Sequence, residues 1–421
     1  MVDGFRITGK TPLNGVIKVS GAKNAALPII IATLVAKGEY ILKNVPNLRD
    51  IRVTMKLLED LGMITEKLDN NTYKIINNGF KRTEASYQIV KQMRASFLVM
   101  GPMIANLDEA VVSLPGGCAI GSRPVDLHLK GFEMLGADIT RVHGYVHAKS
   151  DNLKGAEIPL GFPSVGATQN IMMAAVKTPG KTIISNAARE PEIVDLGNFL
   201  NKMGAKITGL GTPNIEIEGV KELHAVEYSI MPDRIEAGTY IIAALVTEGD
   251  LKIQDARLED LGVFKSELEA MGVKFKQDGD ILSVIGKAKD LKPSKIKTLP
   301  HPGFPTDMQA QFTALMTVAQ GESTMIETVF ENRFQHLEEM RRMGLHSEIL
   351  RDTAMIHGGL PLQGARVMST DLRASAALIL TGMVAEGTTT VGKLTHLDRG
   401  YYQFHEKLAK LGADISRVSE A

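Results

Sequence analysis

Several residue types are scarce or missing in this chain of 421 residues, and each absence excludes a class of protein. One cysteine cannot form an internal disulfide or a paired metal-binding motif, which favours a reducing, cytoplasmic setting. The 48 basic side chains balance the 48 acidic ones, so no basic excess is available for nucleic acid or an anionic membrane surface. Tryptophan is absent, and 13 Phe with 8 Tyr leave few rings for stacking on bases. The 10 histidines show no metal-binding spacing such as HExxH.

Long hydrophobic runs are missing as well. The longest strongly apolar stretch extends from Ala25 to Ala36, contains Pro28 and ends before Lys37. A helix that crosses a bilayer needs about 20 apolar residues. The first six residues include charged side chains and lack the apolar centre of a signal peptide. We therefore expect a soluble intracellular protein that does not insert into membranes.

The chain is long enough for more than one hydrophobic core. Its composition, 44% hydrophobic and 23% charged, is that of an ordinary globular protein and not of a disordered one. A single core rarely organises more than about 250–300 residues. We therefore expect two domains.

A sixfold repeat is the clearest pattern in the sequence. The phrase Leu-x-x-hydrophobic-Gly-hydrophobic, or a close variant, ends six helix-like segments, and its glycines are 68 to 74 residues apart. Such glycines suit the C-terminal end of a helix, where a positive φ is needed. The six are Gly62, Gly136, Gly204, Gly272, Gly344 and Gly412.

Each repeat carries the same surroundings. An apolar segment precedes a small or acidic turn and an alternating strand, then come the amphipathic helix, its glycine and further strand pattern. The apolar segments are residues 25–35, 96–104, 168–176, 238–246, 308–318 and 375–384. Because these helices are apolar nearly all round, they should be buried. We predict an α/β (α+β) fold of two inside-out, barrel-like domains, each with three helix-strand-helix-strand-strand repeats; a linear solenoid is the alternative.

The N-terminal ends of the apolar segments collect polar side chains. Four of the six carry a base there, namely Lys23, Arg94, Arg234 and Arg373. A helix N-terminus already favours anions, so added cations suggest a bound anionic molecule. The plainer interpretation is helix capping, which fits Ser164, Thr306, Asp307 and Asp371 when each is taken singly. If the helices of each domain run parallel, these ends meet on one face and form a cationic pocket.

A glycine-rich segment at residues 115–124 holds the single cysteine, Cys118, and has a proline at each end. Ser122 and Arg123 stand where a nucleotide-binding P-loop needs Lys-Ser/Thr, so that motif is excluded. A lone cysteine is usually a small buried hydrophobe. In an exposed loop beside Arg123, a reactive thiol is the favoured interpretation. His128 follows the loop and is a further candidate to face a site.

Motifs along nearly the whole chain resemble one enzyme family. They are Gly21-Ala-Lys23-Asn24-Ala, the Cys118 segment through Arg-Pro-Val-Asp-Leu-His128, Pro305-Thr-Asp307, Glu-Asn-Arg333-Phe and Asp-Arg399-Gly. These are similar to the UDP-N-acetylglucosamine 1-carboxyvinyltransferases, the enolpyruvyl transferases that open bacterial peptidoglycan synthesis and support cell-wall growth. The resemblance implies two inside-out domains, one spanning 22–231 and the other combining 1–21 with 232–421, with the active site in the cleft between them.

The implied reaction transfers enolpyruvyl from phosphoenolpyruvate to the 3-hydroxyl of UDP-N-acetylglucosamine by addition and elimination, with release of phosphate. By position in the family's motifs, Lys23, Arg123 and Arg399 bind the phosphate. Arg333 and Arg373 bind the carboxylate. Guanidinium groups suit both anions because they offer paired hydrogen bonds.

The same resemblance assigns two further catalytic roles. Asp307 matches the base, or the group that orients the hydroxyl, and Cys118 matches the proton donor that fosfomycin alkylates in this family. Lys23 and Arg399 also count as catalytic. The other implied substrate contacts are Asn24, Arg94, Pro124, Val125, Asp126, Leu127, Phe162, Pro163, Ser164, Val165 and Val329. No metal or organic cofactor is implied.

One position departs from the family's pattern. Phe162-Pro163 stands where a Lys-Val pair is expected before Ser164, so a cation for the uridine diphosphate is absent or replaced by backbone contacts. Two other functions remain open. The shikimate-pathway enolpyruvyl transferase shares the cationic residues but lacks the Cys118 loop, and a non-catalytic repeat or clamp protein would not need charges at its helix ends. The oligomeric state has no signature in the sequence.

Overall fold

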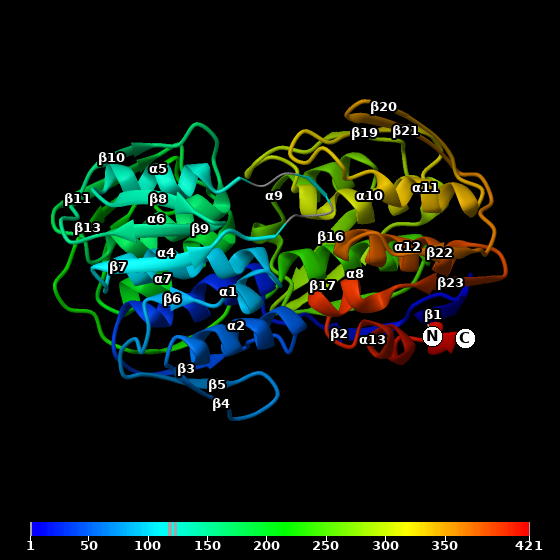
Figure 1. The fold of residues 1–421 in the computed structure, drawn as a ribbon. Coiled ribbons are helices and arrows are strands. Elements are labelled where there is room, and N and C mark those ends of the chain that lie inside the picture. The colour runs from blue at the N-terminus through cyan, green and yellow to red at the C-terminus, as the bar shows by residue number, and fades with distance from the viewer. Residues whose placement is uncertain (1, 117–119, 122–123, 421) are drawn as a thin grey trace. The chain divides into compact units, whose positions relative to one another are not determined.

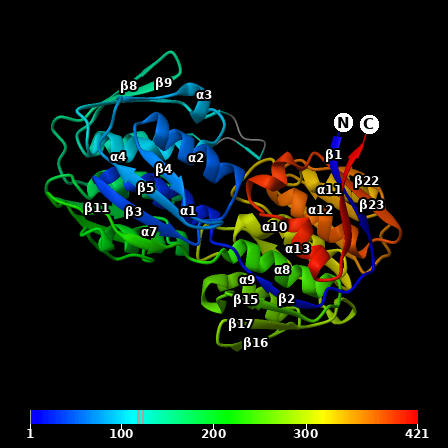
Figure 2. The same cartoon turned by 90° about the horizontal axis from the view of Figure 1, so that it is seen from below.

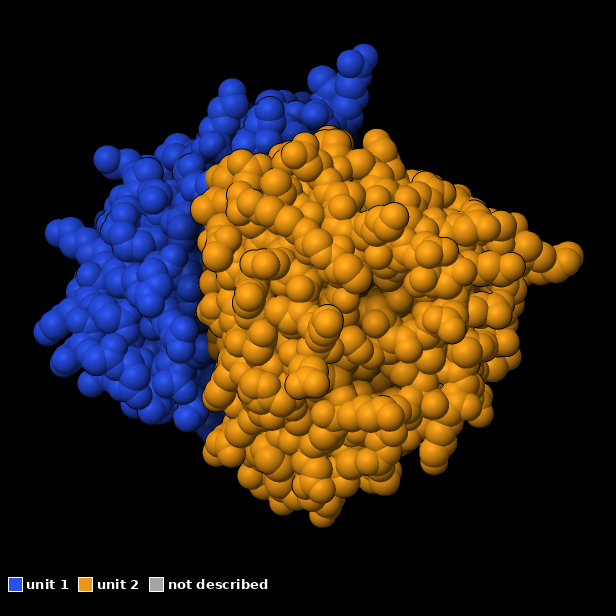
Figure 3. Space-filling view, turned by 90° about the vertical axis from the view of Figure 1, so that its left-hand side faces the viewer, with its two compact units in different colours: residues 1–20, 118–122, 232–421 blue, residues 21–117, 123–231 orange. Residues whose placement is uncertain are grey.

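The chain forms two compact units in the computed structural model, which describes residues 2–116, 120–121 and 124–420 (Figures 1 and 2). Unit 1 comprises residues 1–20, 118–122 and 232–421, and unit 2 comprises residues 21–117 and 123–231 (Figure 3). Apart from residues 118–122, the chain leaves unit 1 after Ser20 and returns to it at Pro232. The division of chemical tasks between the domains 22–231 and 1–21 plus 232–421 stays a prediction.

Each unit contains three four-stranded sheets. In unit 2 the strand orders are β14 (Glu227–Ser229), β3 (Gly38–Lys43), β5 (Tyr73–Asn77), β4 (Ile64–Lys67); β6 (Glu84–Ala85), β7 (Glu109–Ser113), β9 (Tyr145–Lys149), β8 (Asp138–Val142); and β10 (Glu157–Pro159), β11 (Lys181–Ser185), β13 (Asn214–Glu218), β12 (Lys206–Thr208). In unit 1 they are β2 (Gly15–Lys18), β15 (Leu251–Gln254), β17 (Ile281–Ile285), β16 (Lys274–Asp278); β18 (Lys295–Lys297), β19 (Gly321–Ile326), β21 (Thr353–Gly358), β20 (His346–Leu350); and β22 (Arg366–Met368), β23 (Thr388–Gly392), β1 (Val2–Thr8), β24 (Asp414–Glu420).

Apolar helices fill the interior of each unit, as the sequence predicts. In unit 2 they are α1 (Lys23–Ala32) with η1 (Thr33–Val35), η2 (Arg94–Val99) with α4 (Met100–Ile104), and α6 (Val165–Ala175). In unit 1 they are α8 (Arg234–Val246), η4 (Thr306–Met308) with α10 (Gln309–Met316), and α12 (Leu372–Val384). Every residue of α8 is buried, because this helix is apolar on nearly all sides. The inside-out fold class is confirmed.

Amphipathic helices cover the space between sheets and buried helices. They are α2 (Arg49–Asp60), α5 (Asp126–Met134), α7 (Pro191–Lys202), α9 (Leu258–Ala270), α11 (Gln335–Arg342) and α13 (Phe404–Lys410); the short helices are α3 (Tyr87–Val90), η3 (Ala288–Asp290) and η5 (Leu394–Arg399). The six predicted glycines follow the six longer helices, with φ between 91° and 109°. A side chain with a Cβ is strained at that φ, which explains the recurring glycine.

Two details differ from the predicted repeat. Each sheet has a fourth, parallel edge strand, which the sequence pattern does not reveal because most of these strands have only two or three residues. The predicted helix at 96–104 begins instead as the 3₁₀ helix η2 and becomes α-helical at Met100. Pro102 contributes to this break, since it has no N–H and its ring obstructs the carbonyl four residues earlier.

The edge strands show how the chain crosses between units. In four of the six sheets, the edge strand pairs with the strand that comes after the next buried helix of the same unit. At the two crossings between units the pairing differs. The edge strand β2 precedes α1 of unit 2 yet pairs with β15 of unit 1. Likewise β14 precedes α8 of unit 1 yet pairs with β3 of unit 2. The N-terminal β1 completes the sixth sheet between β23 and β24, so the two ends of the chain lie side by side (Figure 2). Among the described residues, no helix has the length and hydrophobicity to cross a membrane.

Candidate active site

The N-terminal ends of the three buried helices of unit 1 lie close together. α8, α10 and α12 pack against one another, and acidic residues cap two of them. Asp233 accepts from the backbone N–H groups of Ile235 and Glu236, at 2.8 and 3.1 Å. Asp371 caps α12 in the same way, accepting from the N–H groups of Arg373 and Ala374. The capping interpretation is therefore correct for Asp371.

Asp307 has a different task from capping. Its carboxylate bridges two arginines: Oδ1 accepts from Arg333 Nη2 at 2.8 Å, and Oδ2 accepts from Arg373 Nη2 at 3.0 Å. The arginine side chains are only 3% and 5% exposed, whereas Asp307 keeps 29% exposure. Arg333 and Arg373, called the arginine pair below, are thus held by one acid that solvent can reach.

The arginine pair sets the charge state of Asp307. Burial alone would raise the pKa of this carboxyl, but the charges of Arg373 and Arg333 outweigh burial and hold the pKa well below its usual range. In this state Asp307 is a stable anion and a weak proton acceptor. The sequence placed all three residues in one site, and the structure brings them into direct contact.

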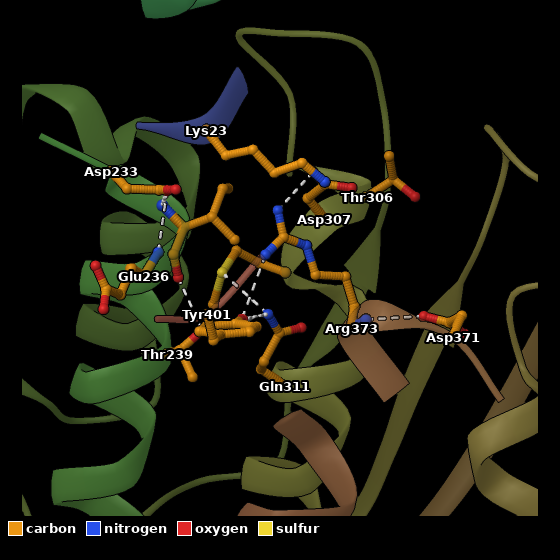
Figure 4. A network of polar contacts seen from close by, with 12 residues as sticks. Lys23, Asp233, Glu236, Thr239, Thr306, Asp307, Gln311, Asp371, Arg373 and Tyr401 are labelled. Atoms are coloured by element: carbon orange, nitrogen blue, oxygen red, sulfur yellow. Dashed lines mark hydrogen bonds and ion pairs between the residues drawn. The ribbon is translucent and has the colours of Figure 1, made fainter. Parts of the chain in front are cut away.

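Tyr401 holds the other side of Arg373 (Figure 4). Arg373 Nη1 lies 3.3 Å from the phenol oxygen, and its guanidinium lies 5.6 Å from the ring centroid. Gln311 Nε2 also donates to this oxygen at 3.1 Å. Thr239 gives its own proton to the Ile235 carbonyl, so the phenol donates to Thr239 at 2.8 Å. Burial raises the pKa of Tyr401, which keeps the phenol protonated.

Two further predicted residues of unit 1 lie near the ends of secondary-structure elements. Arg399 is the last residue of η5, and Val329 follows β19. The Val329 backbone N–H donates to Glu327 Oε1 at 2.8 Å. The predicted phosphate contact of Arg399 stays a prediction.

Unit 2 contains the predicted Lys23 at the start of α1. Lys23 is buried, and its Nζ lies 2.7 Å from Asp50 Oδ2, on α2. Asn24 is the next residue of the same helix. Separating a buried cation from its carboxylate would leave an uncompensated charge, so Asp50, which was not among the predicted residues, holds Lys23 in place.

The other predicted contacts of unit 2 lie in three segments. Arg94, at the start of η2, donates from Nη2 to the Pro124 carbonyl at 3.2 Å. Ser164 caps α6 by accepting from the Ala167 N–H at 3.3 Å, which confirms its capping role. Phe162 is 45% exposed. The remaining predicted contacts are Val125, Asp126 and Leu127 at the start of α5 and Pro163 and Val165 at the start of α6.

His128 is a packing residue. Its ring is buried, its Nδ1 lies 3.0 Å from Asn170 Nδ2, and Phe97 meets it edge-on at 5.4 Å. Burial, aided by the charge of Arg94, lowers the pKa of His128 to about 3, so the ring is neutral at physiological pH. Because the Asn170 amide donates to Nδ1, the His128 proton resides on Nε2.

Cys118 and Arg123 lie outside the described residues, so their predicted roles stay predictions. Among the described residues, no group of three or more His, Cys, Asp or Glu side chains is arranged to hold a metal.

Several polar residues that support the site were not among the predicted residues. Besides Asp50 and Tyr401, the clearest is Glu327, directly after β19. A signal existed: Ser323 and Met325 alternate along β19 and are fully buried, and Glu327 follows them at the same spacing of two residues. Period-two alternation therefore places an acid on the inward face of the sheet.

Comparisons with known proteins agree with the fold described above. Residues 7–408 match the family described as EPSP synthase (3-phosphoshikimate 1-carboxyvinyltransferase). The enolpyruvyl transferase NikO from Streptomyces tendae has a TM-score of 0.91 at 23% identity, with 100% of both chains covered. An EPSP synthase from Acinetobacter baumannii has a TM-score of 0.78 at 19% identity, covering 99% of this chain and 100% of its own. At these identities the structures establish the fold, and the family match establishes the enzyme class, which excludes a non-catalytic repeat protein. The chain belongs to the EPSP synthase family of enolpyruvyl transferases, which transfer the enolpyruvyl group of phosphoenolpyruvate to a hydroxyl group.

Proposed function

We propose that the acceptor is the 3-hydroxyl of UDP-N-acetylglucosamine. In that case the enzyme catalyses the first committed step of peptidoglycan synthesis. The observation that carries the proposal is the Cys118 segment through His128, together with Lys23-Asn24 at the start of α1. The shikimate-pathway enzymes share the cationic residues but have no equivalent of this segment.

The arginine pair provides the proposed site for the carboxylate of phosphoenolpyruvate. Arg333 and Arg373 already hold a carboxylate, that of Asp307, with one oxygen on each guanidinium. The substrate carboxylate has the same chemistry and matches the same donors. Lys23, Arg123 and Arg399 are proposed for the phosphate, where added positive charge stabilises the leaving group.

Asp307 is proposed to become the catalytic base when the carboxylate of phosphoenolpyruvate replaces its own carboxylate on the arginine pair. While it bridges the arginine pair, its low pKa makes it a poor base. When the carboxylate of phosphoenolpyruvate binds Arg333 and Arg373, Asp307 loses those partners and its pKa rises. Asp307 therefore becomes an effective base only when phosphoenolpyruvate is bound.

The reaction then proceeds in two balanced steps. The acceptor oxygen attacks C2 of phosphoenolpyruvate, its proton passes to Asp307, and the C3 methylene takes a proton from Cys118. The resulting tetrahedral ketal returns a proton from the new methyl group to the Cys118 thiolate, the carbon–carbon double bond is restored, and the C2–O bond to phosphate breaks as the departing phosphate takes the proton held by Asp307. The products are the enolpyruvyl ether and inorganic phosphate.

Unit 2 supplies most of the proposed contacts to the acceptor. Arg94 places a guanidinium beside the backbone of Pro124, and it is the proposed cation for the diphosphate. The exposed ring of Phe162 replaces the lysine expected there, so we propose apolar and backbone contacts at that position. Asn24, Ser164 and the segment 124–127 complete the set.

Phosphate release from phosphoenolpyruvate tests the acceptor. We expect release with UDP-N-acetylglucosamine and background release with shikimate 3-phosphate. Shikimate 3-phosphate is the alternative acceptor, because the description of the matched family names 3-phosphoshikimate. Release with shikimate 3-phosphate alone would reverse the assignment, and release with neither would require a different hydroxyl compound.

A further inference from the structure

Glu327 is a buried carboxylate held by neutral donors. It is 4% exposed, and no cation in the described part of the chain forms an ion pair with it. Oε1 accepts from Thr298 Oγ1 at 2.9 Å and from the N–H groups of Val329 and Phe330 at 2.8 and 3.1 Å. Oε2 accepts from Thr306 Oγ1 at 2.8 Å. Burying a carboxylate without a counter-ion is unfavourable, and these four hydrogen bonds compensate the Glu327 carboxylate for the water that it loses.

The bond to Glu327 fixes the direction of the Thr306 hydroxyl. A hydroxyl has one proton, and Thr306 donates it to Glu327. Its lone pairs therefore face Arg333, whose Nη1 donates to Thr306 Oγ1 at 2.7 Å. The negative charge of Glu327 polarises this hydroxyl and makes it a better acceptor for the guanidinium.

A second contact leads from Glu327 to the same arginine. The Phe330 N–H donates to Glu327, which fixes the turn after β19. The Phe330 ring faces Arg333, with the guanidinium carbon 5.1 Å from the ring centroid. Glu327 thus supports Arg333 from two sides, through a hydroxyl and through an aromatic face.

We propose that Glu327 is a positioning residue that holds Arg333 in the orientation needed to receive the carboxylate of phosphoenolpyruvate. It acts through Thr306 and Phe330 and does not itself touch the substrate. Asp307 also orients Arg333, but in the proposed reaction that bond is exchanged for the substrate. The contacts from Glu327 are those that persist during the exchange. This inference rests on the proposed role of Arg333.

The Glu327→Gln variant tests the proposal. Glutamine keeps the shape but replaces one acceptor oxygen with an NH₂ group, so either Thr306 or a backbone N–H loses its acceptor. We expect the KM for phosphoenolpyruvate to rise about tenfold, with the acceptor KM changed less than about twofold. Thr306→Val should give the same pattern, because it removes the hydroxyl that links Glu327 to Arg333. Thr306→Ser keeps the hydroxyl and should behave as the wild type.

The double variant Glu327→Gln/Thr306→Val separates positioning from general stability. If both residues act through Arg333, the double variant should be no worse than the more affected single variant. Additive losses, an unchanged KM for phosphoenolpyruvate, or equal rises for both substrates would overturn the proposal. If Glu327→Gln does not fold, the comparison of Thr306→Val with Thr306→Ser decides it alone.

Direct binding of phosphoenolpyruvate, measured by equilibrium dialysis without any acceptor, keeps this test independent of the acceptor assignment. The wild-type protein should bind about tenfold more tightly than Glu327→Gln or Thr306→Val. Equal binding by all three proteins would contradict the role of Glu327 even if UDP-N-acetylglucosamine proves to be the acceptor. Weaker binding by the variants would support that role even if the acceptor proves to be another hydroxyl compound.

Discussion

The two units use the same repeat but equip their helix ends differently. In unit 1, the helix ends carry a dense buried network in which Asp307 joins Arg333 and Arg373, and Tyr401 supports Arg373. In unit 2, Lys23 has a buried acidic partner in Asp50, whereas Arg94 donates to a backbone carbonyl. The same repeat can therefore carry a network of several linked side chains, as in unit 1, or separate contacts, as in unit 2.

The difference matches the chemistry of the two proposed substrates. Phosphoenolpyruvate is small and carries two anionic groups, a carboxylate and a phosphate, so fixed guanidinium groups suit it. The proposed acceptor is larger and uncharged over much of its surface, so contacts from loops and helix ends suit it. We infer that unit 1 mainly determines the binding of the carboxylate of phosphoenolpyruvate and unit 2 mainly that of the acceptor. The variants below test this separation.

Arg373→Lys should have the largest effect. Lysine keeps the charge but cannot reach Asp307 and Tyr401 with two nitrogens at once, and each lost charge-assisted bond costs about 1.5–3 kcal/mol. We expect kcat/KM to fall about 100-fold or more. Arg417→Lys is the matched control, since Arg417 pairs with Asp3 in an exposed position of the same unit. A value within about twofold of wild type would show that Arg373 is only structural.

Arg94→Ala should affect the other substrate. Removing this guanidinium should raise the KM for UDP-N-acetylglucosamine about tenfold and leave the KM for phosphoenolpyruvate within about twofold. Lys181→Ala, on β11 of unit 2 where the exposed Lys181 pairs with Glu216, controls for the loss of one positive charge. Steady-state kinetics with each substrate varied in turn provides both constants. An equal rise in the two KM values would contradict the proposed division of substrate binding between the units.

Tyr401→Phe should have a moderate effect within unit 1. The variant keeps the ring under Arg373 but removes the hydroxyl that meets Arg373, Thr239 and Gln311. We expect a loss of about 1–3 kcal/mol in unfolding free energy and a rise of several-fold in the KM for phosphoenolpyruvate. Urea unfolding and kinetics check the two effects. Wild-type values for both would mean that the hydroxyl contributes nothing to the position of Arg373.

The smallest effect concerns pH and unit 2. His128 has a pKa of about 3 in the folded protein, below the ordinary value of 6.5. Between these values the unfolded chain binds a proton that the folded protein does not, so folding stability should decrease as pH falls from 6.5 towards 3. The slope for one such group is about 1.4 kcal/mol per pH unit. His128→Gln should reduce this slope in urea unfolding between pH 7 and pH 5; an unchanged slope would show that His128 also takes up its proton when folded.

The sequence was sufficient for the repeated parts of the fold. Six glycines at a regular spacing predicted six helix ends, because each must adopt a positive φ after its helix. Apolar segments without a polar face predicted the buried helices. The edge strands were missed because residues such as Glu84–Ala85 are too few to show alternation. Their exchange at the two crossings depends on pairing between distant segments, which no local pattern records.

The candidate site was predictable by residue but not by contact. The sequence motifs assigned Asp307, Arg333 and Arg373 to one site, and only the folded structure shows that the Asp307 carboxylate bridges the two arginines. Tyr401 was missed because one buried phenol has no sequence signature until its partners are known, and Glu327 was missed because strand alternation places it inward without showing its partners. Their contacts join segments that are far apart along the chain.

The binding of phosphoenolpyruvate to Asp307→Asn, measured directly and compared with wild type, tests the central claim about unit 1. If Asp307 occupies the arginine pair until the substrate carboxylate replaces it, its removal should abolish turnover yet tighten binding about fivefold or more. Asp3→Asn, which removes an exposed negative charge of the same unit, should bind as the wild type. Unchanged or weaker binding by Asp307→Asn would contradict the exchange of carboxylates.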